Sequence, residues 1–120
     1  MREILFRGKT VCDGDWIYGG ITWNPSKKKV FIHTEWDEGE VIPETVGQYT
    51  GMTDKNGTKI FEHDIVRIAV CGTYDNYVVS YDKENARFVV GDTGFTFWSY
   101  ISTKIEVIGN IHDSPELLNK

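Results

Sequence analysis

Imidazole and thiol side chains are the groups of this chain that could hold a metal ion or carry nucleophilic and acid–base chemistry. The chain has three histidines and two cysteines, which are His33, His63, His112, Cys12 and Cys71. A zinc site needs convergent ligands that usually come in closely spaced pairs, and neither cysteine has a histidine or a second cysteine within four residues. We therefore expect no metal, and we expect both cysteines to be free thiols that pack as small buried apolar groups.

Acidic residues next to two of the histidines offer a second kind of chemistry, general acid–base catalysis. Asp64 follows His63 and Asp113 follows His112, but adjacent residues on a strand point to opposite faces, so neither pair is a catalytic pair. Glu62 and Asp64 would share one face of an extended segment and could bind a cation there. Solvated charges at the start of a strand are the commoner arrangement, and we expect that arrangement here.

Phosphate-binding and nucleophile motifs give no further candidate. The glycines form neither a G-x-x-x-x-G-K-[ST] loop nor a G-x-S-x-G elbow. Cys12 lies beside Asp13 and Asp15, whose negative charge disfavours the thiolate that a nucleophile requires. The sequence thus predicts a protein that is not an enzyme and that has no cofactor.

Charge is unevenly distributed along the chain, whose formal net charge is −5. Residues 1–30 carry six basic groups against three acidic ones, whereas residues 31–66 carry eight acidic groups against two basic ones. Nucleic-acid binding normally needs a basic balance or stripe, so nucleic acid is not the expected partner. A contiguous basic face built from Arg2, Arg7, Lys9 and the lysines at 27–29 would favour the alternative, a small barrel associated with nucleic acid.

Exposed aromatic and basic side chains are the candidate binding residues. The sequence is 13% aromatic, and most of these rings are expected to form the core and its rim. Trp36 is isolated in an acidic stretch and is the ring expected to be exposed. Lys27, Lys28 and Lys29 follow an Asn-Pro-Ser turn and are expected at a solvated hairpin tip. We expect a homo-oligomer, most simply a dimer, with Trp36 at the interface, and a phage or host protein is the other possible partner.

Short apolar runs between turn residues define the expected elements. Strands are expected at residues 3–6, 16–18, 21–23, 30–32, 65–70, 77–81, 87–90 and 105–111, with a break at Gly19 and Gly20. This spacing indicates a single mainly β domain over residues 1–120, either a small SH3-like or partly open β-barrel or a two-layer sandwich. One helical turn is expected at 114–118, where a serine precedes a proline. Residues 96–101 fit a strand or a helical turn.

A turn at residues 54–57 is the strongest local signal. Its sequence, DKNG, suits a hairpin of the primed type, in which Asn56 and Gly57 would both take positive φ. Strands are therefore expected on either side of it. We expect Gly57 at the tip of a two-stranded hairpin.

The chain resembles the YopX family through segments at both ends and in the centre. These are REILFRGK at 2–9, WIYGG at 16–20, the stretch 43–68 around the DKNG turn, and IEVIGNIHDSPELL at 105–118. The resemblance implies a small phage- or prophage-encoded protein and implies no particular reaction. The family usually has glycine where this chain has His63 in EHDIV, which predicts a turn at that position.

Location is the last property that the sequence addresses. No apolar run approaches the ~20 residues that a membrane helix requires. The N-terminal residues lack the apolar stretch and cleavage pattern of a secretory leader. We expect a cytoplasmic protein with no membrane partner.

Overall fold

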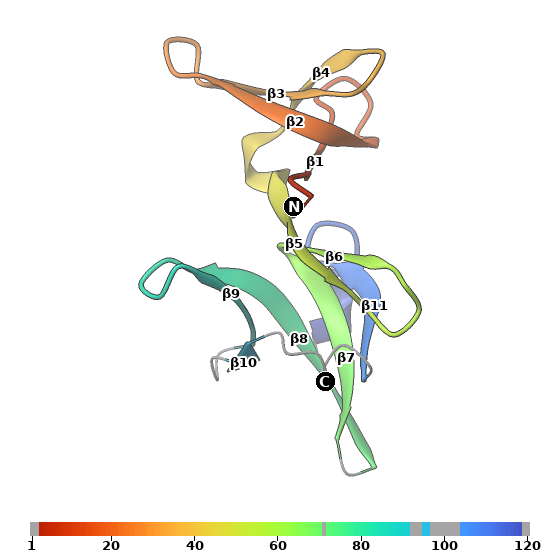
Figure 1. Cartoon of the computed structure of the whole chain (residues 1–120). Helices are drawn as coiled ribbons and strands as arrows, with labels where there is room; N and C mark the ends of the chain where they lie inside the picture. Colours follow the sequence, from red (N-terminus) through yellow and green to blue (C-terminus); the bar gives the residue numbers. More distant parts are fainter. Residues whose placement is uncertain (1–2, 71, 92–94, 97–103, 119–120) are drawn as a thin grey trace. The chain divides into compact units, whose positions relative to one another are not determined.

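Antiparallel strands account for nearly all regular structure in the chain. The structure, a computed structural model, describes residues 3–70, 72–91, 95–96 and 104–118 (Figure 1). In these ranges the helical residues are confined to two short 3₁₀ turns, η1 (Pro43–Thr45) and η2 (Pro115–Leu118). The expected mainly β class is confirmed. The chain divides into two compact units, unit 1 at residues 1–49 and unit 2 at residues 50–120.

Unit 1 is built on an antiparallel sheet whose strands are mostly consecutive in the sequence. Its strands are β1 (Phe6–Lys9), β2 (Trp16–Asn24), β3 (Lys29–His33), β4 (Glu38–Val41) and the first residues of β5 (Gly47–Thr53), which continues into unit 2. The order across the sheet is β4-β3-β2-β1-β5. The expected break at Gly19 and Gly20 is wrong, since β2 runs through both. A Cβ on Gly19 would lie 1.9 Å from the His33 carbonyl oxygen, so this glycine permits a close backbone approach.

The core of unit 1 lies on one face of this sheet. Val30, Ile32 and Val41 are buried, and Phe6, Ile17 and Val46 pack against them. The first strand begins at Phe6 and includes Arg7, Gly8 and Lys9, so the strand expected at 3–6 is displaced. The reason is pairing: Phe6 lies opposite Gly19 and Lys9 opposite Trp16, which places the whole run in the ladder.

The sheet of unit 1 curls at the end of β4 without becoming a closed barrel. Thr10 and Val41 form an isolated bridge, and the Ile42 amide donates to the Lys9 carbonyl at 2.9 Å. A single bridge is not a strand pairing, and the strand order of the described residues leaves β4 at an edge. The SH3-like or partly open barrel stays a prediction.

Unit 2 combines a hairpin with a second antiparallel sheet. The hairpin consists of the end of β5 and β6 (Lys59–Phe61). The sheet contains β7 (Asp64–Val70), β8 (Thr73–Asp82), β9 (Arg87–Val90), β10 (Phe95–Thr96) and β11 (Ile105–Asn110). Its order is β10-β9-β8-β7-β11. The strands expected at 65–70, 77–81, 87–90 and 105–111 are confirmed within two to four residues at their ends.

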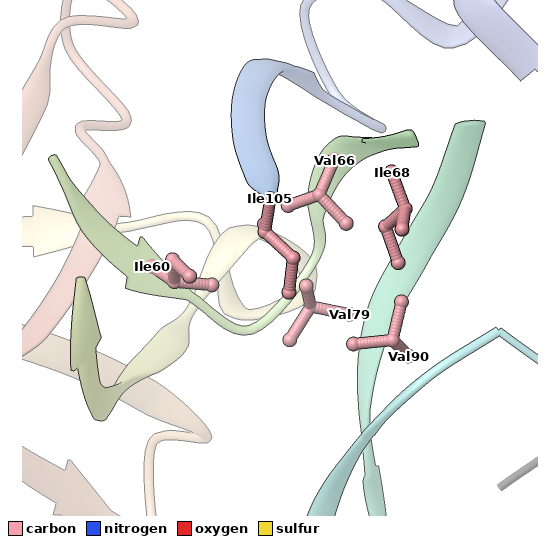
Figure 2. Close-up of a cluster of buried hydrophobic side chains, with 6 residues drawn as sticks. All are labelled: Ile60, Val66, Ile68, Val79, Val90 and Ile105. Carbon is pink, nitrogen blue, oxygen red and sulfur yellow. The ribbon is translucent and has the colours of Figure 1, made fainter. Parts of the chain in front are cut away.

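One apolar cluster forms the core of unit 2. Six buried side chains gather around Ile105 (Figure 2), and they are Ile60, Val66, Ile68, Val79, Val90 and Ile105. Met52, Tyr77 and Val107 pack against them. The alternation of side chains along β7, β8 and β11 places these residues on one face, which Ile60 of the hairpin covers.

The expected hairpin at residues 54–57 is confirmed, but its turn is of another type. Gly57 has φ +82°, whereas Asn56 is not among the residues with positive φ. The Gly57 amide donates to the Asp54 carbonyl at 3.0 Å, and the Asp54 amide donates to the Thr58 carbonyl at 2.8 Å. This is a three-residue connection, in which only the last position must be left-handed. The prediction of a primed turn, with Asn56 also left-handed, is therefore wrong.

The C-terminal helical turn is confirmed as η2, where the Leu117 amide donates to the Ser114 carbonyl at 3.1 Å. The prediction for residues 96–101 falls mostly outside the described residues, as does Cys71. No described helix is both long and apolar enough to cross a membrane. Compactness of two units does not test whether either folds alone, so the single domain over 1–120 stays a prediction.

Candidate functional site

The three candidate lysines lie at the turn between β2 and β3. Lys27 and Lys28 belong to the turn, Lys29 is the first residue of β3, and all three are exposed. The Asn24 side chain orders this turn by accepting bonds from the Lys27 amide at 3.2 Å and the Ser26 hydroxyl at 2.9 Å. The solvated hairpin tip expected from the sequence is confirmed, and we call it the basic tip (residues 25–29).

Trp36 lies at the turn between β3 and β4, and 89% of its surface is exposed. The expected exposure is confirmed. Thr34 orders the turn, because its hydroxyl oxygen accepts the Asp37 amide at 2.9 Å and the Trp36 amide at 3.3 Å. The Thr34 amide also donates to the Asp37 carbonyl at 2.7 Å. The indole is therefore carried on a hydrogen-bonded turn, which we call the acidic tip (residues 34–38).

The two tips lie at opposite ends of β3, as Figure 1 shows. They also differ in charge. Lys27 and Lys28 make no ion pair, while Lys29 Nζ lies 3.7 Å from Glu40. At the other end, Glu35 makes no ion pair and Glu38 lies 3.2 Å from His33 Nδ1. Unit 1 thus separates exposed positive and negative charge along one strand.

Two apolar side chains near the basic tip are exposed, and the sequence did not single them out as surface residues. Trp23 is 53% exposed and Ile21 is 38% exposed. Trp23 lies opposite Val30 and Ile21 opposite Ile32, so both belong to the apolar face of the sheet. They extend that face to the surface beside the lysines. Only the strand register reveals this, because their β-type alternation looks the same in a covered and an uncovered strand.

The remaining described cations of the N-terminal segment do not join the basic tip. Arg7 is buried and its guanidinium carbon lies 4.6 Å from the centre of the Trp16 ring, while Lys9 Nζ lies 5.7 Å from the same ring. Trp16 starts β2 and the lysine turn follows its end, a separation of roughly 25 Å at ~3.3 Å per residue. Arg2 lies outside the described residues.

The short connection between β6 and β7 contains His63, which has φ +77°. The turn expected from the family's glycine is confirmed, and the backbone is the one that glycine favours. Asp64 is only 2% exposed, and its Oδ2 accepts the Phe61 amide at 2.7 Å across the turn. The solvated Asp64 expected from the sequence is therefore wrong. Glu62 lies in the turn and Asp64 begins β7, so they do not share a strand face.

His63 and His112 come together in unit 2, which sequence spacing did not indicate. Their rings are edge to face with centres 5.3 Å apart, and the Ile111 amide donates to the His63 carbonyl at 3.0 Å. The Glu62 carboxylate lies 3.8 Å from His63 Nε2. Nevertheless, no three histidine, cysteine, aspartate or glutamate side chains of the described residues converge as metal ligands. The geometry is that of a packed turn.

Cys12 is exposed, contrary to the expectation that it is buried. It lies in a turn whose bonds come from its neighbours: Asp13 accepts the Thr10 hydroxyl and, at 3.0 Å, the Asp15 amide. The Thr10 hydroxyl bond and then the Asp15 amide hold the pKa of Asp13 below its ordinary value. The turn therefore presents a carboxylate beside the thiol and no base.

Substitution of His63 tests the strain at this turn. Glycine normally destabilises a position by about 0.5–1 kcal/mol relative to alanine, but a left-handed residue with a Cβ costs roughly 1–2 kcal/mol. We therefore expect His63→Gly to be more stable than His63→Ala, although both remove the imidazole contact. Urea unfolding of the two variants measures the difference. Alanine as the more stable variant would contradict the left-handed backbone.

Comparison with known proteins follows from this geometry. The model of the YopX protein family matches residues 7–119. The chain belongs to the YopX family. Its fold is similar to the crystal structure of protein EF1440 from Enterococcus faecalis, with a TM-score of 0.69 and 22% identity over 99% of this chain and 100% of that one. No match was found among the curated proteins. The family and the fold are thus established for this YopX protein, and its site rests on its own geometry.

Proposed function

We propose that this YopX protein is a non-enzymatic binding module that self-associates, most simply as a homodimer, through the acidic tip. The observation that carries the proposal is Trp36, a large ring that is 89% exposed on a hydrogen-bonded turn. Tryptophan is the side chain most enriched among residues that dominate interface energies. Because the turn is already ordered, docking this ring costs little conformational entropy. We further propose a cytoplasmic phage or prophage accessory role, which the family supports.

The roles of the polar groups in unit 2 support a non-enzymatic protein. Asp54 accepts three backbone amides, from Asn56, Thr58 and Val107, each at 2.9 Å. Asp64 accepts the Phe61 amide, and the His63 main chain bonds Val79 and Ile111. These groups are the ones that an acid–base site would need, and the structure uses them to hold turns and strands together.

The nucleic-acid alternative gains no observation from the fold. Its distinguishing feature would be a continuous basic face, and the described cations fall into two groups. Arg7 and Lys9 stack on Trp16, and the lysines of the basic tip lie at the other end of β2. Neither group alone forms the stripe that tracks a phosphate backbone.

Sedimentation velocity of wild type and Trp36→Ala tests the proposal. We expect a dimer for wild type at tens of micromolar. Loss of an interface tryptophan costs about 2 kcal/mol or more, so dissociation of Trp36→Ala should be at least ~30-fold easier. Tyr74→Ala is the matched control, since Tyr74 is an exposed aromatic residue of unit 2. Wild type that stays monomeric would remove self-association, and a dimer unaffected by Trp36→Ala would remove the anchor.

A further inference from the structure

We infer that the partner surface for the acidic tip is the basic tip of a second copy, in a two-fold dimer that makes this contact twice. The inference rests on the proposed self-association and goes further by naming the surface on which Trp36 docks. Its basis is the separation of charge along β3, where exposed lysines lie at one end and exposed carboxylates with Trp36 lie at the other.

Charge complementarity favours a second copy over an unrelated partner. The basic tip offers Lys27 and Lys28 without ion pairs, and the acidic tip offers Glu35 without an ion pair and Glu38 beside His33. Two copies with antiparallel β3 strands bring each acidic tip to the other's basic tip. Parallel copies would instead bring like charges together, which is unfavourable. The same surface therefore selects one orientation.

An apolar seat for Trp36 accompanies the lysines. Trp23 and Ile21 are exposed on β2 and lie next to the basic tip in the sequence and in the sheet. An indole resting there would cover apolar surface that unit 1 leaves in water. Lys27 and Lys28 would surround the ring, and an ammonium group close to the face of an indole is attracted to it.

The division of labour between ring and charges follows from their exposure. Surface ion pairs contribute little affinity because water and salt screen them, so the buried indole would supply most of the binding energy. The charges would set the orientation and exclude wrong pairings. In a two-fold dimer both contacts form together, so weak individual contacts add within one interface.

Charge reversal tests the pairing of opposite tips. Lys27→Glu with Lys28→Glu gives a chain with two acidic tips, and Glu35→Lys with Glu38→Lys gives a chain with two basic tips. None of these four side chains makes a hydrogen bond that orders its turn, since the bonds there come from Asn24 and Thr34. We expect each double variant alone to be monomeric, with dimerisation weakened at least tenfold, because its tips repel.

Mixing the two variants is the decisive arm. Fluorescence-detected sedimentation, with one variant labelled, should show a 1:1 heterodimer with affinity within a few-fold of wild type. The chain that carries all four reversals should also dimerise. Lys55→Glu with Lys83→Glu has the same change in net charge on exposed lysines of unit 2 and should dimerise as wild type does.

The outcomes separate this inference from the proposed function. Double variants that dimerise like wild type, or a mixture that stays monomeric, would overturn the pairing of opposite tips. If Trp36→Ala still weakens the dimer in that case, self-association through Trp36 stands with another docking surface. Wild type that is monomeric throughout would overturn both.

Discussion

Gly19→Ala is expected to destabilise unit 1 by about 3 kcal/mol or more. A Cβ at this position would lie 1.9 Å from the His33 carbonyl oxygen and 2.7 Å from its carbonyl carbon. Both atoms belong to the backbone and cannot turn aside as a flexible side chain can. Overpacking typically costs 1–3 kcal/mol, and a clash between backbones falls at or beyond the upper end of that range. Relief requires β2 and β3 to separate, which disturbs the pairing that positions Val30 and Ile32.

Gly20→Ala provides the matched control for this experiment. The two glycines are adjacent on β2, but a Cβ on Gly20 would meet nothing within 4 Å. Alanine at this strand position should be neutral or slightly stabilising, because it restricts the unfolded chain more than glycine does. Urea unfolding monitored by tryptophan fluorescence measures both variants. Equal stabilities for the two variants would show that the approach of His33 to β2 is not close.

Asp54→Ala is expected to cost about 3–5 kcal/mol, the second large effect. The Asp54 carboxylate is buried and accepts the amides of Asn56, Thr58 and Val107. Hydrogen bonds to a charged group contribute roughly 1.5–3 kcal/mol each, and the substitution leaves three donors without their acceptor. The Val107 bond matters most for the fold, because it ties the hairpin tip to β11. Urea unfolding measures the loss, and amide exchange at Val107 should accelerate.

Asp82→Ala is the control for Asp54→Ala. Asp82 also orders its own turn, accepting the amides of Glu84 at 3.1 Å and Asn85 at 3.4 Å, but the structure gives it no bond to a distant strand of the kind that Asp54 makes. It should cost much less than Asp54→Ala. A loss at Asp82 as large as that at Asp54 would contradict the importance of the link to Val107.

Local features of the fold could be predicted from the sequence because their causes are local. A Ser-Pro pair starts η2, and Gly57 completes a turn that only a left-handed residue can close. Trp36 could be predicted as exposed because its acidic neighbours make burial costly. The turn at His63 was found by family resemblance, since the residue itself gives no sign of positive φ. The type of the turn at 54–57 was mistaken because Asn-Gly serves more than one geometry.

Features that depend on distant residues could not be predicted. The burial of Asp64 requires the Phe61 amide in a particular turn, and the meeting of His63 with His112 requires β11 to lie beside β7. Gly19 looked like a strand breaker because nothing in the sequence shows that His33 approaches it. The opposite placement of the two tips also follows only from the register of β2 and β3. In each case the missing information is which strands become neighbours.

The place of β11 in unit 2 has a consequence for the order in which the chain is synthesised. Ile105 lies in the middle of the core, and β11 pairs with β7, whose residues leave the ribosome well before it. The meander of unit 1 can pair as each strand emerges, since β2, β3 and β4 are consecutive. Until β11 has emerged, however, β7 presents an open edge with buried-type residues such as Ile65 and Val66, which is a template for aggregation. Nascent chains that stall before residue 105 are therefore the species of this protein most in need of a chaperone.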